Sequence, residues 1–261
     1  KYIFKYSMVI LISIWTYWCF LVTFLVYIFL LPLNLFLVFF LGEYGKNIFV
    51  QYNRYVGNVL LMLYGMRRKV KGAYPINFNE PCIYIANHKS YLDVIIIASL
   101  VPQKIKYLGK KEVFDWPLIG FFAKYSGQIA VQRENKDSRN NAYDLMKKSI
   151  NEGYSIVLFP EGGWRNRGDE KYANPYDFKM NKLLNPFRNG AFRLAIETQT
   201  PIIPIALINA GEKFSSKTMK IIPGTLHVYV FDRLFPVNIT DPLILNQKCY
   251  DMIYKKLEEC K

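Results

Sequence analysis

The N-terminal part of the chain is the feature that most restricts the fold, because it is long, apolar and uncharged. From Tyr6 to Gly42 the sequence contains no charged residue. A helix needs about 20 apolar residues to cross the hydrocarbon core of a bilayer, so this run holds one membrane span with a surplus, or two shorter helices. Proline interrupts the hydrogen-bond ladder of a helix, so a bend is expected near Pro32. The run therefore predicts a membrane-embedded N-terminal helix or a two-helix hairpin that enters and leaves one leaflet.

A secretory signal peptide is the alternative explanation for this run. The apolar part is longer than a usual signal core, and no small-residue cleavage site follows it. We therefore expect the segment to be retained. We divide the chain into a membrane-associated helical segment at residues 1–66 and a second domain at residues 67–261.

Basic residues are concentrated after the apolar run. The chain has 34 Lys and Arg against 20 Asp and Glu, and only Lys1 and Lys5 of the basic residues precede Glu43. A cluster of them follows the apolar end closely: Lys46, Arg54, Arg67, Arg68, Lys69 and Lys71. Lys and Arg beside membrane segments mark the cytoplasmic side, so we expect the second domain to lie on the cytoplasmic face of a membrane.

The charge excess predicts an anionic partner. A lipid surface fits, because anionic head groups attract each juxtamembrane Lys or Arg by about 1 kcal/mol, and the same field attracts phosphate-rich small molecules. A merely solvated basic surface is the alternative. Nucleic acid is not expected, since the sequence has no helix-turn-helix, zinc-finger or aromatic-strand signature. The scattered cysteines Cys19, Cys82, Cys249 and Cys260 predict a reducing compartment and no metal site.

Beyond Gly72, short β-rich runs alternate with helical stretches. The expected strands are Cys82–Ala86, Ile105–Leu108, Gln128–Gln132, Ser155–Phe159, Ile202–Leu207 and Leu226–Phe231. The expected helices are Tyr91–Leu100, Lys136–Asn151, Arg188–Thr198 and Leu243–Glu259. This alternation predicts an α/β fold with a mixed, largely parallel central sheet flanked by helices. Ligands bind at the carboxyl ends of strands in such sheets, so polar residues that follow a strand are the candidates for a site.

His88 directly follows the first of these strands, and Asp93 lies five residues further on. An imidazole is a good general base near pH 7, and a carboxylate on its other ring nitrogen fixes the tautomer and stabilises the imidazolium. On a regular helix the two side chains would face different ways, so the pair requires His88 in a loop and Asp93 in the first turn of a helix. Two alternatives stay open: Ser90 to Asp93 also fits a capping box, and His88 can be a structural loop histidine.

The segment that carries this pair resembles the NHxxxxD signature of the glycerolipid acyltransferase family, which includes lysophosphatidate acyltransferases. It reads Asn87-His88-Lys89-Ser90-Tyr91-Leu92-Asp93. Three further blocks are similar to those of the family and stand in the same order: residues 109–120 with Arg133, Phe159-Pro160-Glu161-Gly162, and Pro201–Leu207. The resemblance covers residues 82–207 and implies that the domain at residues 67–261 is a catalytic acyltransferase domain.

The resemblance also implies roles for individual residues. His88 and Asp93 are expected to be catalytic. Arg133 is expected to bind the phosphate of the acceptor, for which its planar fork of donors is suited; a strand-end arginine paired with an acid is the alternative. Glu161 is expected to contact the acceptor, although a structural ion pair would look the same in the sequence.

Glycines and lysines near these blocks complete the candidate substrate-binding set. Gly162 and Gly163 let backbone approach a substrate closely, and their amides can bind an oxyanion or a phosphate; an ordinary tight turn is the alternative. Lys110 and Lys111 can meet anionic groups of the donor or acceptor, or be solvated.

One block departs from the family pattern. The family continues Glu-Gly-Thr-Arg, whereas here Gly162 is followed by Gly163-Trp164-Arg165. Arg165 is expected to stand in for the missing arginine. The second histidine, His227, lies on a strand face and is expected to be structural.

These residues and the resemblance together imply an O-acyltransferase of phospholipid biosynthesis that needs no cofactor. The expected reaction moves a fatty acyl group from acyl-CoA or acyl-acyl carrier protein (acyl-ACP) to the free hydroxyl of 1-acyl-glycerol-3-phosphate, with His88 as general base and no covalent intermediate. The alternatives are a different acceptor (another lysophospholipid, glycerol phosphate or a lyso-aminolipid), a hydrolase with Ser90 as nucleophile, and a non-catalytic lipid-binding protein. The sequence leaves the acyl chain length, the choice between the two donors and the oligomeric state open.

Overall fold

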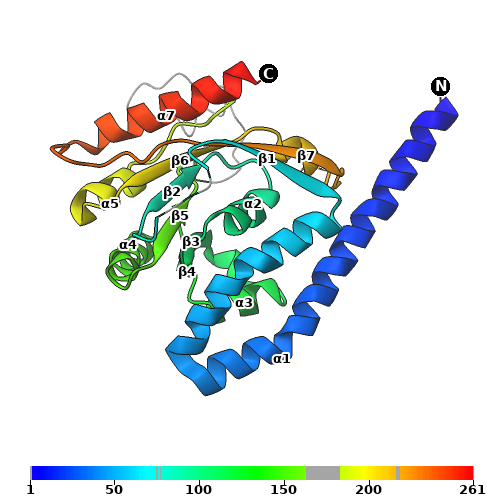
Figure 1. The fold of residues 1–261 in the computed structure, drawn as a ribbon, viewed down its shortest axis with the longest axis horizontal. Helices are drawn as coiled ribbons and strands as arrows, with labels where there is room; N and C mark the ends of the chain where they lie inside the picture. The colour runs from blue at the N-terminus through cyan, green and yellow to red at the C-terminus, as the bar shows by residue number, and fades with distance from the viewer. Residues whose placement is uncertain (1, 75, 77, 163–182, 216–217, 261) are drawn as a thin grey trace.

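A seven-stranded sheet flanked by helices forms the body of the protein (Figure 1). The computed structural model describes residues 2–74, 76, 78–162, 183–215 and 218–260, without the side chains of residues 2–6. The strands are β1 (Met66–Gly72), β2 (Ile83–Ala86), β3 (Ile105–Lys110), β4 (Ile129–Val131), β5 (Ser155–Leu158), β6 (Ile202–Leu207) and β7 (Gly224–Val230). The helices are α1 (Tyr2–Leu63), α2 (Leu92–Leu100), the 3-10 helix η1 (Lys111–Asp115), α3 (Ile119–Tyr125), α4 (Lys136–Asn151), α5 (Gly190–Thr198), α6 (Ala210–Lys213) and α7 (Pro242–Glu259).

The sheet has the order β1-β7-β6-β2-β5-β3-β4. All neighbouring strands run parallel except β6 and β7. The predicted α/β fold with a mixed, largely parallel sheet is confirmed. The central strand β2 is buried at every position, as expected for a strand covered on both faces: Tyr84 packs with α1 and α2, whereas Ile83 and Ile85 pack with α4, α5 and α7.

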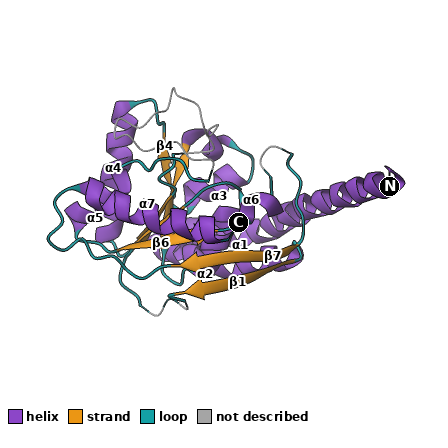
Figure 2. Cartoon of the chain, turned by 90° about the horizontal axis from the view of Figure 1, so that it is seen from above, coloured by secondary structure: helices purple, strands orange, loops and turns teal. Residues whose placement is uncertain are grey.

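Strand β1 was not predicted. Residues 66–72 are so rich in Lys and Arg that the sequence suggested a juxtamembrane basic segment, but they pair in parallel with β7 from Met66–Gly224 to Gly72–Val230. Figure 2 shows the two strands side by side at the edge of the sheet. An edge strand tolerates charge because one of its faces and its outer edge meet water, so the charge pattern hid its β structure.

Helix α1 folds into two long arms. The sequence predicted the break at Pro32, but Pro32 lies inside the helix and the non-helical backbone is at Gly42, with φ 53° and ψ −128°. A glycine adopts this positive φ at little cost. The turn is tight, since a Cβ added at Gly45 would lie 1.7 Å from the carbonyl oxygen of Leu37. A two-helix hairpin therefore precedes the sheet, and the predicted boundary at residue 66 falls at its junction with β1.

The second arm of α1 (residues 43–63) packs on the rest of the protein. A Cβ added at Gly57 would lie 3.3 Å from the carbonyl oxygen of Ile95 and from Cβ of Ser99, both in α2. Leu60 and Leu61, each 2% exposed, belong to the same buried cluster as α2 and one face of the sheet. The hairpin is therefore part of the core.

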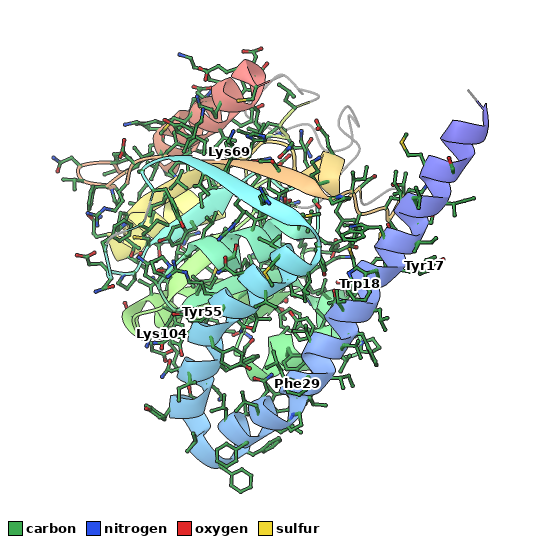
Figure 3. All side chains as sticks on the ribbon, turned by 45° about the vertical axis from the view of Figure 1, so that its right-hand side comes forward. Tyr17, Trp18, Phe29, Tyr55, Lys69 and Lys104 are labelled. Atoms are coloured by element: carbon green, nitrogen blue, oxygen red, sulfur yellow. The ribbon has the colours of Figure 1, made fainter. Side chains whose placement is uncertain are left out.

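The first arm of α1 (residues 2–41) carries large apolar side chains to the surface. Tyr17 is 74% exposed and Phe29 is 84% exposed, and Figure 3 shows both on the outer side of this arm. By length and apolar composition, α1 is able to cross a membrane. An arm of this length extends about 60 Å as helix, twice the roughly 30 Å of a hydrocarbon core. Such an apolar surface is stable in lipid and unfavourable in water.

Candidate active site

The loop that follows β2 is fixed at its start by Asn87. Nδ2 of Asn87 donates to the carbonyl oxygen of Leu207 at 2.8 Å. Oδ1 of Asn87 accepts the backbone N–H of Leu207, also at 2.8 Å. Asn87 is fully buried, so both groups of its side chain are satisfied by β6, the neighbouring strand. The loop therefore leaves the carboxyl end of β2 in a defined direction, and His88 comes next.

His88 and Asp93 form a hydrogen-bonded pair. Nδ1–H of His88 donates to Oδ2 of Asp93 at 2.8 Å, with His88 in the loop and Asp93 in the first turn of α2. The ring of His88 lies against Phe159, with 4.0 Å between the ring centroids and 15° between the planes. A carboxylate only accepts hydrogen bonds, so it holds the proton on Nδ1 and leaves Nε2 as the basic nitrogen.

Asp93 also orders the loop that contains its partner. Its Oδ2 accepts the backbone N–H groups of Lys89 at 2.7 Å and Ser90 at 2.8 Å, and the residue is fully buried. The bond to Ser90 is the one that a capping box provides. The capping hypothesis and the catalytic-pair hypothesis for Asp93 therefore both hold, because one carboxylate oxygen caps the loop and also bonds the imidazole.

Ser90 is committed to the backbone. Its side chain is fully buried, and its hydroxyl donates to the carbonyl oxygen of Phe214 at 2.8 Å and accepts the N–H of Leu92 at 3.2 Å. A serine nucleophile needs its hydroxyl hydrogen-bonded to the base, whereas Nδ1 of His88 is bonded to Asp93. The geometry therefore gives no support to a hydrolase built on Ser90.

Glu161 lies beside this pair, after β5. Its Oε1 accepts the backbone N–H of His88 and its Oε2 accepts that of Asn185, both at 2.8 Å, and the residue is 2% exposed. Strands β2 and β5 are neighbours and parallel, so the loops at their carboxyl ends meet. Glu161 thus positions the backbone of His88; whether it also contacts an acceptor stays a prediction.

A cavity of about 1360 Å³ opens in front of His88. Its apolar part is formed by both arms of α1 with Phe20, Tyr27 and Leu60, and by α2 with Ile95. Its polar part contains Lys110, Arg133 and Arg188. His88 and Phe159 lie in the wall of the same cavity. One space therefore joins an apolar region, a basic nitrogen and a cationic region.

The polar part of the cavity brings Arg133 and Gly162 together. Nη1 of Arg133 donates a short hydrogen bond to the carbonyl oxygen of Gly162. Gly162 has φ +75°, and a Cβ there would lie 2.7 Å from Nε of Arg188, so this position requires glycine. The N–H of Gly162 donates to the carbonyl oxygen of Phe159 at 3.0 Å, which uses it within the turn. A backbone N–H that stabilises an oxyanion must therefore come from a different residue.

The other predicted residues differ in their placement. Lys110 lines the cavity but pairs with Glu112 at 2.9 Å, which lowers the pKa of the Glu112 carboxyl. Lys111 begins η1, is exposed and is not among the residues that line the cavity. Gly163 and Arg165 lie outside the described residues.

Arg188 and Phe159 were not assigned a role from the sequence. Both line the cavity. Phe159 begins the third block that resembles the family, and Arg188 lies between the third and fourth blocks. The contact of Phe159 with His88 and that of Arg188 with Gly162 form only once distant segments are brought together.

The acyltransferase family model matches residues 67–208 of the chain. The chain belongs to the acyltransferase family. The match includes all the predicted site residues from His88 to Arg165.

Two proteins similar to this acyltransferase are both named 1-acyl-sn-glycerol-3-phosphate acyltransferases. It is 24% identical over 172 residues to the 1-acyl-sn-glycerol-3-phosphate acyltransferase beta of Homo sapiens, covering 66% of this chain and 57% of that protein. It is 30% identical over 181 residues to the 1-acyl-sn-glycerol-3-phosphate acyltransferase of Haemophilus influenzae, covering 68% of each chain. The chain thus spans little more than half the length of the human protein.

A solved structure has the same fold along almost the whole chain. The crystal structure of the 1-acyl-sn-glycerophosphate (LPA) acyltransferase of Thermotoga maritima matches with a TM-score of 0.78 at 17% sequence identity, over 96% of both chains. The N-terminal hairpin of this acyltransferase therefore belongs to the shared fold.

Exchanging the buried carboxylate of Glu161 for an amide should weaken this acyltransferase structurally. In Glu161→Gln, one oxygen remains as an acceptor, and the new NH₂ group faces a backbone N–H. An unsatisfied buried donor costs about 1–3 kcal/mol, so we expect the free energy of unfolding in detergent to fall by about that amount and transfer activity to fall with it. The exposed Glu258→Gln on α7 is the control; equal stability of the two variants would contradict the role of Glu161.

Proposed function

We propose that this acyltransferase moves a fatty acyl group from acyl-CoA or acyl-ACP to the free hydroxyl of 1-acyl-glycerol-3-phosphate, giving phosphatidic acid. The observation that carries the proposal is the His88–Asp93 pair in a cavity with an apolar and a cationic region. The names of similar human and bacterial proteins support this acceptor. The basic residues after the apolar run support a catalytic domain on the cytoplasmic face of a membrane.

The proposed chemistry is a direct transfer with His88 as general base. Nε2 takes the proton of the acceptor hydroxyl while its oxygen attacks the thioester carbonyl carbon. The tetrahedral intermediate then expels the thiolate, which takes the proton back from the imidazolium. An ester bond forms as the thioester bond breaks, so no acyl-enzyme is needed. Asp93 stabilises the imidazolium that exists between the two proton transfers.

The two regions of the cavity suit the two ends of the substrates. Apolar side chains from the α1 arms, such as Phe20 and Leu60, can accommodate a fatty acyl chain at about 0.8 kcal/mol per buried CH₂ group. Arg133 can bind the acceptor phosphate through its planar donors. In this proposal the acyl carbonyl and the acceptor hydroxyl meet between the two regions, beside His88.

Replacing the planar guanidinium of Arg133 should weaken binding of the acceptor much more than it slows the acyl-transfer step. We expect Arg133→Lys to raise the KM for 1-acyl-glycerol-3-phosphate by about 10- to 100-fold with a small change in kcat, because lysine keeps the charge but loses the bidentate geometry. Steady-state kinetics with the acceptor varied measure this. Lys124→Gln, an exposed position outside the cavity lining, is the control. A tenfold loss of kcat at unchanged KM would contradict the assigned role.

A radiolabelled acyl-donor assay against a panel of lysolipids tests the proposed reaction. The panel contains 1-acyl-glycerol-3-phosphate, glycerol phosphate, other lysophospholipids and a lyso-aminolipid, each with acyl-CoA and with acyl-ACP. The proposal expects label in phosphatidic acid. Label in another lipid would replace the acceptor, release of free fatty acid would indicate a hydrolase, and no turnover would indicate a lipid-binding protein.

A further inference from the structure

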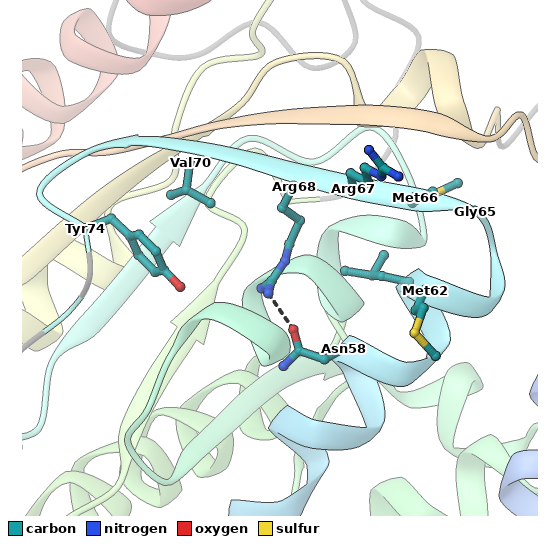
Figure 4. A pocket seen from close by; sticks show the side chains of 9 residues that line it. Asn58, Met62, Gly65, Met66, Arg67, Arg68, Val70 and Tyr74 are labelled. Atoms are coloured by element: carbon teal, nitrogen blue, oxygen red, sulfur yellow. Dashed lines mark hydrogen bonds between the residues drawn. The ribbon is translucent and has the colours of Figure 1, made fainter.

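A second cavity, of about 770 Å³, lies between the second arm of α1 and strand β1 (Figure 4). Asn58 and Met62 of α1 form one side, and Arg67, Arg68 and Tyr74 form the other. Within the described part of the chain it shares no lining residue with the active-site cavity. The proposed chemistry assigns nothing to this cavity, although the guanidinium of Arg68 faces it.

Arg68 is held in a fixed position by neutral groups. Its Nη1 donates to Oγ of Ser99 at 2.7 Å, and its Nη2 donates a short hydrogen bond to Oδ1 of Asn58 (Figure 4). None of the ion pairs among the described residues includes Arg68. Burial lowers the pKa of its guanidinium. Arg68 is thus a half-buried cation without a carboxylate counterion in that part of the chain.

The surroundings of Arg68 add positive charge. Arg54 on α1 is close enough to lower the pKa of Arg68 further, whereas the exposed side chain of Arg67 lies on the other face of the strand (Figure 4). None of the described residues that line the cavity is an Asp or a Glu. A guanidinium has five N–H donors, and the two hydrogen bonds to Asn58 and Ser99 leave further donors. The site is therefore suited to bind a phosphate.

An apolar stripe on α1 leads to this cavity. Tyr55, Val59 and Met62 are 70%, 42% and 68% exposed. Residues spaced by four and three positions lie on one face of a helix. Met62, at the end of the stripe, also lines the cavity. A cationic pocket that continues into an apolar surface matches a phospholipid, whose phosphate is joined to acyl chains, better than it matches a soluble phosphate.

We propose that the cavity between the second arm of α1 and β1 binds the head group of an anionic phospholipid of the surrounding bilayer, with its phosphate on Arg68 and an acyl chain along the Tyr55–Met62 stripe. This lipid is neither the acyl donor nor the acceptor. It joins the hairpin to the edge of the sheet at the level of the lipid head groups. The inference does not rest on the proposed reaction, because the two cavities are separate.

Lipid binding to the full chain in detergent micelles tests this site. Native mass spectrometry gives the affinity for phosphatidylglycerol and for phosphatidylcholine with the same acyl chains. We expect the wild-type chain to bind phosphatidylglycerol more tightly. In Arg68→Gln this affinity should fall by about five- to tenfold, since each Lys or Arg beside anionic lipid contributes about that factor. Glutamine keeps a donor for Ser99 or Asn58, so the strand should stay attached to the helices.

The chain offers a matched control on the same strand. Lys69→Gln removes one charge at the next position, where the side chain is exposed and alternates to the other face, and it should leave the affinity unchanged. Met62→Gln, at an exposed position of the stripe, should lower the affinity about two- to fivefold because it removes apolar contact with the acyl chain, and it gives an answer even if Arg68→Gln misfolds.

Four results would overturn the proposal. They are wild-type affinity in both Met62→Gln and Arg68→Gln, an equal loss in Lys69→Gln, equal binding of the two lipids, and displacement of phosphatidylglycerol by excess inorganic phosphate. An equal loss in Lys69→Gln would show that only the overall positive charge attracts the lipid. Displacement by inorganic phosphate would show a site for soluble phosphate. Transfer activity of Arg68→Gln in the same micelles is measured in parallel, and it should equal that of the wild type.

Discussion

Replacing His88 with alanine should lower kcat by about 10²- to 10⁴-fold, which is the usual contribution of a positioned general base. His88 is the imidazole that Asp93 holds in the cavity wall, and its removal leaves water to accept the acceptor proton. KM should change little, because the proposed binding regions for the phosphate and the acyl chain are other parts of the cavity. The measurement is steady-state transfer of a radiolabelled acyl group to 1-acyl-glycerol-3-phosphate.

The second histidine of the chain provides the control. His227 is exposed on β7 and does not line the cavity, so His227→Ala should retain wild-type kcat. The circular dichroism spectra of both variants should be similar, because without the imidazole the carboxylate of Asp93 still accepts the backbone N–H groups of Lys89 and Ser90. Wild-type turnover in His88→Ala would refute the general-base mechanism.

The six strands other than β1 could be predicted from short apolar or β-branched runs, and the fully buried strands β2, β5 and β6 match the predicted bounds within one residue. β5 and β6 are apolar at nearly every position and begin at the predicted residues. Strand β1 could not be predicted, because its residues alternate between a basic outer face and an inner face that includes Arg68. Its pairing with β7 spans most of the chain, and local composition carries no information about such a partner.

The break in α1 shows why a residue-type rule can point to the wrong position. Pro32 is the stronger helix breaker on propensity, yet a helix can continue through proline when its other bonds hold, as it does here. Reversing the chain instead requires φ and ψ outside the helical region, which Gly42 adopts at little cost. The tight approach of Gly45 to Leu37 is a tertiary contact that the sequence does not display.

In the candidate site, too, contacts within one short segment could be predicted from the sequence, whereas contacts between distant segments could not. The pair of His88 with Asp93 could be predicted because both residues lie in one short segment. The contact of Glu161 with the backbone of His88 links residues 73 positions apart, and that of Arg133 with Gly162 links residues 29 apart. Resemblance to a family identified these residues as functional, but only the sheet order shows that Glu161 supports the loop of the base.

Replacing Asp93 with asparagine separates the two roles of this carboxylate. An amide oxygen can still accept the backbone N–H groups of Lys89 and Ser90, so the loop should keep much of its order. The same oxygen can also accept Nδ1–H of His88, but a neutral amide no longer stabilises the positive charge of its imidazolium. We expect kcat to fall by about 10²- to 10⁴-fold, with a loss of about 1–2 kcal/mol in the free energy of unfolding, because one buried charge-assisted acceptor is replaced.

A double-mutant cycle shows whether Asp93 acts through His88. If it is a positioning residue for the imidazole, His88→Ala with Asp93→Asn should be about as slow as His88→Ala alone, because groups that act as a unit are strongly non-additive. If Asp93 is merely a helix cap, Asp93→Asn should lose stability but keep most of its kcat, and the two effects on kcat should multiply. Because the same oxygen of Asp93 meets both the imidazole and the loop amides, only the rate of the double variant distinguishes these cases.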